Sequence, residues 1–228
     1  MFKKWALGML LMSSSLTSNA ALMSFDTTLT GADMAGLEVV ATFNDLTTET
    51  LEWQTISTIL GTSGNDIIDH EGYVGGVSGA NWSLTQQGYT GGNFDGAGGF
   101  FGAWSFVDSS QLGITKLEIF SNDTNIFFDT SFLTDLSDDS NGSGQGREFI
   151  AYKDGAEFFG YSLSYGDNLV DELYGSLTLD LTTPGTSFNF LIDTDKLIDV
   201  PEPSSLVTLV SAVIGLMVIR RRKIVGKE

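Results

Sequence analysis

Apolar and polar residues alternate with a period of two in short segments along most of this chain. In residues 37–43 (LEVVATF), for example, Leu37, Val39 and Ala41 would share one face. This pattern is typical of β-strands, because successive side chains of a strand point to opposite faces. Alternation or a short apolar run recurs at 51–57, 81–87, 101–107, 114–120, 125–130, 158–165, 173–181 and 187–193.

Turn-forming Gly, Asn, Asp and Ser residues separate these segments, and no long stretch shows the 3.6-residue period of a helix. Residues 130–138 (TSFLTDLSD) could form a short helix. About nine short strands with turn signals predict an all-β fold of the β-sandwich or jelly-roll type. A β-solenoid is the alternative, but the chain lacks the fixed repeat period that a solenoid needs. We therefore expect a single β-sandwich domain at residues 21–195.

Charge and the absence of cysteine limit the chemistry of this domain. Residues 21–200 hold 27 acidic residues and four basic ones, a formal charge of −23. A body this acidic repels nucleic acid and anionic lipid and attracts divalent cations, so we expect no nucleic-acid partner. Because the chain has no cysteine, disulfides, thiolate catalysis and cysteine-ligated zinc are excluded.

The N-terminal 20 residues have the pattern of a secretory signal peptide. Lys3 and Lys4 are followed by an apolar stretch at 5–12, and Ser18 and Ala20 supply the small residues that signal peptidase requires. We expect cleavage after Ala20. An uncleaved anchor is the alternative, but eight apolar residues are too few to span a bilayer.

Residues 196–228 contain three consecutive features. They are the motif Pro201-Glu202-Pro203, the apolar run 204–219, and the tail 220–228, which begins with Arg220-Arg221-Arg222-Lys223. Counted from Pro203, a helix of about 17 residues would rise about 25 Å, just enough to cross a slightly thinned bilayer core. A buried core helix is the alternative. The basic cluster argues against it, because it is a membrane stop that the positive-inside rule keeps in the cytoplasm.

This tail resembles the PEP-CTERM sorting signal of Gram-negative bacteria in the order, spacing and terminal position of its parts. The resemblance covers about the last 28 residues. It implies that an exosortase, a membrane cysteine transpeptidase, recognises Pro201-Glu202-Pro203 and removes the tail. It also implies transient anchoring in the inner membrane, delivery to the cell surface or extracellular matrix, and association with exopolysaccharide or biofilm. The two prolines suit recognition, because they disfavour regular structure and keep the peptide extended.

An acidic segment supplies the candidate metal ligands. Its oxygen-bearing side chains are those of Asp135, Asp138, Asp139, Asn141 and Ser143. Oxygen ligands at alternate positions suit Ca²⁺, and residues 139–144 resemble the opening of an EF-hand loop. The resemblance ends at the twelfth position, which is Ile150 and not the bidentate glutamate. A solvated acidic loop is the alternative.

Two further features have weaker implications. Residues 61–69 (GTSGNDIID) resemble one unit of the calcium-binding repeats of RTX proteins, but a single unit cannot share calcium with a neighbour, which favours a simple turn. His70 is the only histidine of the chain. No nucleophile motif accompanies it, so we assign no catalytic residue.

Taken together, these features predict an exported, non-enzymatic surface or matrix protein that binds glycan, calcium or both. A secreted carbohydrate-active enzyme with paired carboxylates is the alternative, because the many acidic residues of the body could supply such a pair.

Overall fold

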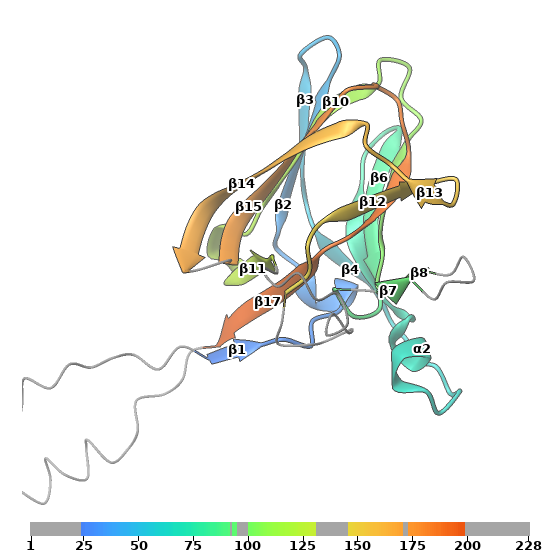
Figure 1. The fold of residues 1–228 in the computed structure, drawn as a ribbon, viewed down its shortest axis with the longest axis vertical. Helices are drawn as coiled ribbons and strands as arrows, with labels where there is room; N and C mark the ends of the chain where they lie inside the picture. The colour runs from blue at the N-terminus through green and yellow to red at the C-terminus, as the bar shows by residue number, and fades with distance from the viewer. Residues whose placement is uncertain (1–23, 92, 95–99, 131–145, 171–172, 199–228) are drawn as a thin grey trace, which may run out of the picture. The chain divides into compact units, whose positions relative to one another are not determined.

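The computed structural model describes residues 24–198, except for 92, 95–99, 131–145 and 171–172. Residues 25–198 form one compact unit, in which two antiparallel sheets pack together as a sandwich (Figure 1). The predicted all-β sandwich is therefore confirmed. The predicted signal peptide and C-terminal helix lie outside the described residues.

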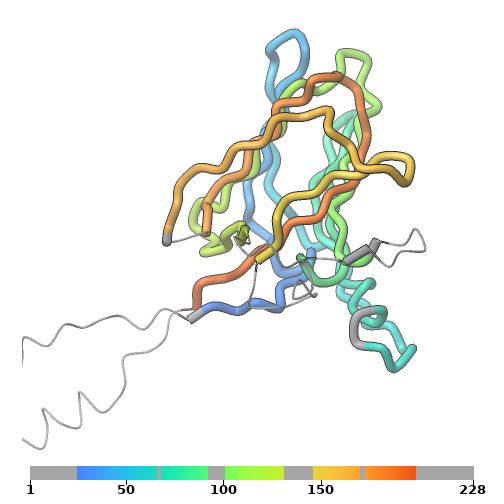
Figure 2. Tube along the Cα trace, in the orientation of Figure 1, coloured from blue at the N-terminus to red at the C-terminus, as the bar shows by residue number. Residues whose placement is uncertain are grey.

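Eight of the described strands form the first sheet. Seven of them follow one another across the sheet, and β14 pairs along nearly the whole length of β15. In spatial order they are β1 (Ser24–Asp26), β17 (Asp193–Ile198), β11 (Ile126–Asp129), β15 (Leu173–Leu181), β10 (Ile114–Phe120), β2 (Glu38–Phe43) and β3 (Thr48–Glu52), with β14 (Tyr161–Val170) alongside β15. Strands β1 and β17 come from opposite ends of this unit and lie next to each other (Figure 2).

Seven described strands form the second sheet. Their spatial order is β13 (Ala156–Glu157), β12 (Ile150–Lys153), β16 (Phe188–Leu191), β9 (Trp104–Asp108), β6 (Trp82–Gln87), β5 (Tyr73–Ser78) and β4 (Gln54–Thr58). The short strands β7 (Asn93–Phe94) and β8 (Phe100–Phe101) pair separately, and the described helices are η3 (Gly31–Met34), α2 (Asp66–His70) and η4 (Asn122–Thr124).

The alternation of the sequence places one apolar face of each sheet in the core. In the first sheet, Leu117 of β10 lies opposite Ala41 of β2 on one side and Leu179 of β15 on the other, and all three are fully buried. From the second sheet, the ring of Trp104 stacks on that of Phe190 at 5.5 Å between centroids. Burial of such apolar surface is the main force that holds the two sheets together.

The predicted strand 51–57 is in fact two strands that belong to different sheets. Trp53 lies between β3 and β4 and is fully buried. Its indole N–H donates to the carbonyl of Gly31 at 2.9 Å, and its ring lies 5.1 Å from that of Trp104. The chain changes sheets here because this large side chain is buried between them.

A second irregularity separates β10 from β11. Both strands pair antiparallel with β15, but helix η4 interrupts them. The turn is held by a hydrogen bond from the Ser121 N–H to the Gly175 carbonyl, 2.7 Å, and by one from the Thr124 hydroxyl to the Ser121 carbonyl, 2.6 Å. This break creates the surface pocket described below.

Candidate functional site

The pairing of β11 with β17 brings three aspartates together, which we call the aspartate cluster. Asp193 and Asp195 are two residues apart on β17, so their side chains point to the same face of the strand. Asp129, the last residue of β11, lies directly opposite Asp193. One carboxylate oxygen from each of the three lies within 4.8 Å of the others. The three residues are only 4%, 1% and 4% exposed for positions 129, 193 and 195.

The cluster is only partly satisfied by hydrogen bonds from the protein. Oδ1 of Asp193 accepts from the hydroxyl of Thr90 and from the backbone N–H of Thr194, both at 2.9 Å. Oδ1 of Asp195 is buried and has no hydrogen-bond partner among the residues that the structure describes. A buried carboxylate oxygen without a donor is costly, so a proton or a nearby cation would stabilise this atom.

Burial and mutual repulsion both disfavour ionisation of the cluster. Burial raises the pKa of Asp193 well above its usual range, and the adjacent Asp195 carboxylate raises it further. Burial also raises the pKa of Asp195 to about 6, although a hydrogen bond with Asp129 acts in the opposite direction. Like charges confined in a poorly solvated site destabilise each other, and a bound divalent cation would remove that repulsion.

The backbone approaches the cluster closely from two segments. A Cβ atom at Gly91, where φ is +82°, would lie 3.0 Å from Oδ1 of Asp193. A Cβ atom at Gly146 would collide with Oδ1 of Asp129. The neighbouring Arg147 is also buried, and its backbone N–H donates to the Asp129 carbonyl at 3.1 Å. These glycines let the chain enclose the carboxylates without side chains that would fill the space.

The donor set decides which ion fits. Three carboxylates provide up to six hard oxygens, and the Thr90 hydroxyl lies within hydrogen-bond distance of one of them. Hard oxygen ligands suit Ca²⁺, Mg²⁺ or Mn²⁺, whereas zinc and copper sites usually include histidine or cysteine. The aspartate cluster could therefore hold a metal ion.

The metal ligands expected from the sequence were different residues. Asp135, Asp138, Asp139, Asn141 and Ser143 all lie outside the described residues. So do the sorting motif Pro201-Glu202-Pro203, the basic cluster Arg220-Arg221-Arg222-Lys223, and the cleavage-site residues Ser18 and Ala20. Sequence reasoning missed the aspartate cluster because its members meet only through strand pairing. The local signal was the Asp-Thr-Asp alternation at 193–195.

The RTX-like segment 61–69 bends at Ser63–Gly64 and then enters helix α2. The carboxylate of Asp69 accepts hydrogen bonds from the Ser63 N–H at 2.7 Å, the Ser63 hydroxyl at 2.9 Å and the Gly64 N–H at 3.1 Å. The adjacent His70 ends helix α2, and its Nε2 lies 3.1 Å from the Tyr89 hydroxyl oxygen. The carboxylate of Asp69 is thus occupied by hydrogen bonds from its own loop, and the segment expected as a simple turn continues into a short helix.

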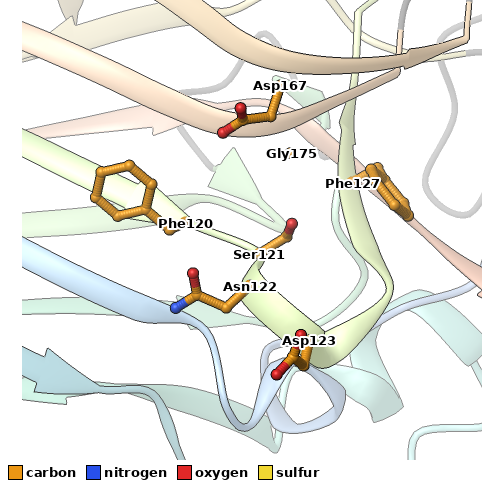
Figure 3. Close-up of a pocket in the computed structure, with 7 residues that line it drawn as sticks. All are labelled: Phe120, Ser121, Asn122, Asp123, Phe127, Asp167 and Gly175. Carbon is orange, nitrogen blue, oxygen red and sulfur yellow. The ribbon is translucent and has the colours of Figure 1, made fainter.

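An open pocket of about 560 Å³ lies at the break between β10 and β11 (Figure 3). It is lined by the turn residues 121–123, by Phe120 and Phe127, and by Asp167 and Gly175. In Figure 3 the two phenyl rings lie on opposite sides of the turn, and the carboxylates of Asp123 and Asp167 lie below and above it.

Comparisons with known proteins do not assign the chain to a family. No protein-family model matches it, and neither a curated protein nor a solved structure gives a significant match. None of the described helices is both long and apolar enough to cross a bilayer.

Proposed function

We propose that this chain is an exported, non-enzymatic protein of the cell surface or extracellular matrix that an exosortase sorts through its C-terminal tail. The observation that carries the proposal is the order of three features in the tail sequence. Pro201-Glu202-Pro203 is followed by the apolar run 204–219 and then by the basic residues 220–223. A β-sandwich body with a formal charge of −23 supports it, because such a body stays soluble outside the membrane.

The aspartate cluster supports a calcium-binding role for the body. Ca²⁺ accepts six to eight oxygens in variable geometry, whereas Mg²⁺ demands near-ideal octahedral ligation and keeps several waters. A buried cluster with three carboxylates and almost no exposed surface provides little room for those waters. The ion would join β11 to β17 and neutralise their carboxylates, so its role is structural.

The burial of the cluster also bears on the enzyme alternative. Paired carboxylates that hydrolyse a glycoside must face the substrate across an accessible cleft. Asp193 is 1% exposed, and its two neighbours are 4% exposed. The aspartate cluster therefore suits an ion and is not an accessible carboxylate pair of this kind.

The fate of the tail tests the sorting proposal. Mature protein from the native host, digested and analysed by mass spectrometry, should begin at Ala21 and yield no peptide from 206–228. In a strain carrying Glu202→Gln or Pro203→Ala, the tail should be retained and the protein should stay in the inner membrane. The matched control is Glu228→Gln, which changes an acid beyond the motif and should be processed normally. Retention of 206–228 in the unmodified protein would make it a plain single-pass membrane protein.

A further inference from the structure

The open pocket at the β10–β11 break has the properties of a ligand site. We propose that it binds a neutral saccharide. The inference rests on the proposed function in one respect, namely that the saccharide belongs to the polysaccharide matrix in which the exported protein resides.

The size of the pocket fits a small ligand group. Its volume of about 560 Å³ lies within the range of about 300–1,000 Å³ that is common for small-molecule sites. The pocket is open to the surface, so a residue within a longer polymer could enter it without a free chain end.

Two partly exposed aromatic rings flank the pocket. Phe120 lies opposite Ser176 on β15 and Glu38 on β2, and Phe127 lies opposite Asp195 on β17. Both rings thus have polar cross-strand neighbours and do not belong to the apolar core cluster. An exposed aromatic face offers apolar area and a π-surface to which the C–H groups of a pyranose ring are complementary.

The remaining lining is polar and carries no basic residue. Asn122, Asp123 and Asp167 are all exposed. Their carboxylates accept hydrogen bonds, and the asparagine amide both donates and accepts, which matches the hydroxyl groups of a sugar. Two carboxylates within an acidic body would repel a uronic acid or a sulfated sugar. The chemistry therefore selects a neutral saccharide.

The backbone around the pocket is held in an uncommon conformation. Asn122, Asn125 and Asp167 have φ values of +45°, +59° and +56°, in the left-handed region that Asn and Asp adopt more readily than other non-glycine residues. At Gly175 an added Cβ atom would lie 3.1 Å from both the Asp167 Cβ and the Ser121 Oγ, so the floor is open because this residue is glycine. Conformations of this kind persist where the surrounding structure over-determines them, and they cluster at ligand sites.

Affinity electrophoresis tests the proposal. The full-length chain in mild detergent would be run in native gels that contain dextran, laminarin, galactomannan or, as the anionic comparison, alginate. We expect at least one neutral polysaccharide to retard the protein, whereas alginate does not. Phe127→Ala and Phe120→Ala should each weaken the apparent affinity by about tenfold, the effect of losing one aromatic stacking contact.

The matched control is Phe159→Ala, because Phe159 is also an exposed phenylalanine, at 74%, but does not line the pocket. This variant should be retarded like the unmodified protein. Asp167→Asn separates loss of binding from loss of folding, because asparagine tolerates the left-handed conformation and the substitution removes only the charge. This variant should bind more weakly while its melting temperature stays constant.

Three results would overturn the inference: retardation by no neutral polysaccharide, retardation by alginate alone, or equal loss of affinity in Phe159→Ala and Phe127→Ala. The processing of the tail is measured separately in cells. A protein that keeps its tail but binds a neutral polysaccharide contradicts the sorting proposal and leaves the pocket assignment intact. If the tail is removed but no neutral polysaccharide binds, the saccharide assignment of the pocket is contradicted and the sorting proposal is not.

Discussion

The RTX-like turn and the aspartate cluster use the same chemical group in opposite ways. In the turn at 61–69, desolvation alone would raise the pKa of Asp69, but hydrogen bonds from Ser63 and Gly64 outweigh it and lower that pKa. In the cluster, burial raises the pKa of both Asp193 and Asp195, and one oxygen of Asp195 has no donor among the described residues. A carboxylate whose hydrogen bonds come from its own loop has no need of an ion, whereas a buried and incompletely bonded one does. Residue type alone does not separate the two cases.

The largest expected difference between the two regions is their response to calcium. Calcium at about 100 times its dissociation constant should stabilise the unmodified protein by about 2.7 kcal/mol, which raises the melting temperature by on the order of 5–10 °C for a domain of this size. Asp193→Asn should abolish this increase, because it removes a ligand charge. Thermal unfolding of the full-length chain with EDTA or with millimolar calcium measures the effect. An equal increase in Asp193→Asn would exclude the cluster as the calcium site.

The substitution Asp195→Asn should shift the melting temperature in opposite directions without and with calcium. In EDTA at pH 7.5, Asp195→Asn should unfold at a higher temperature than the unmodified protein, because it removes a buried charge that repels its neighbours. In millimolar calcium the order should reverse, because the variant lacks a ligand. If the variant melts at the lower temperature under both conditions, the repulsion inferred for the metal-free cluster is wrong.

The pH dependence of the metal-free protein gives a smaller and independent readout. The folded-state pKa of Asp195 is raised to about 6, above the ordinary value of about 4. The folded state therefore binds this proton more tightly, and the resulting stability is present below pH 4 and lost as the pH rises to about 6. In EDTA, urea unfolding between pH 4.5 and 7.5 should show this loss. Asp129 and Asp193 face the same site, and Arg147 adjoins it. The quantity to compare is therefore the unfolding free energy of the unmodified protein minus that of Asp195→Asn, which should fall as the pH rises to about 6. A difference that stays constant or rises with pH would contradict the raised pKa of Asp195.

The smallest effect is expected in the turn. Asp69→Asn removes a carboxylate that is hydrogen-bonded on the surface, so the melting temperature should change little and the calcium-dependent increase should be the same as in the unmodified protein. Parallel melting curves with and without calcium check this. A loss of the calcium increase in this variant would move the ion from the cluster to the RTX-like segment.

Alternation predicted the strands well where both neighbours of a strand are regular. Strands β2, β10, β15 and β16 all lie within segments expected from the sequence, and their apolar faces are buried. It failed where a single residue redirects the chain. The alternation at 158–165 would place Phe159 on the same face as Tyr161, Leu163 and Tyr165, which pack against the core. Phe159 is instead 74% exposed, because Phe158 packs against the core and β14 begins only at Tyr161.

The aspartate cluster was beyond local patterns for a different reason. Strand β17 is rich in polar residues and was not predicted as a strand, yet Asp193, Thr194 and Asp195 are all buried. Thr194 faces Met34, and its backbone N–H bonds to Asp193, so tertiary contacts override the polar composition. The register of β11 with β17 decides that Asp129 meets Asp193, and register cannot be read from either strand alone.

The position of β17 near the end of the domain determines when the aspartate cluster can form. Synthesis proceeds from the N-terminus, and β17 is the last of the described strands, so β11 cannot pair with β17 until residues 193–198 have been made. Pairings between distant segments also form late in folding, because the loop between them must first be closed. A metal ion held by both strands would therefore bind only to a chain that includes residues 193–198, and so would distinguish the complete domain from every shorter fragment.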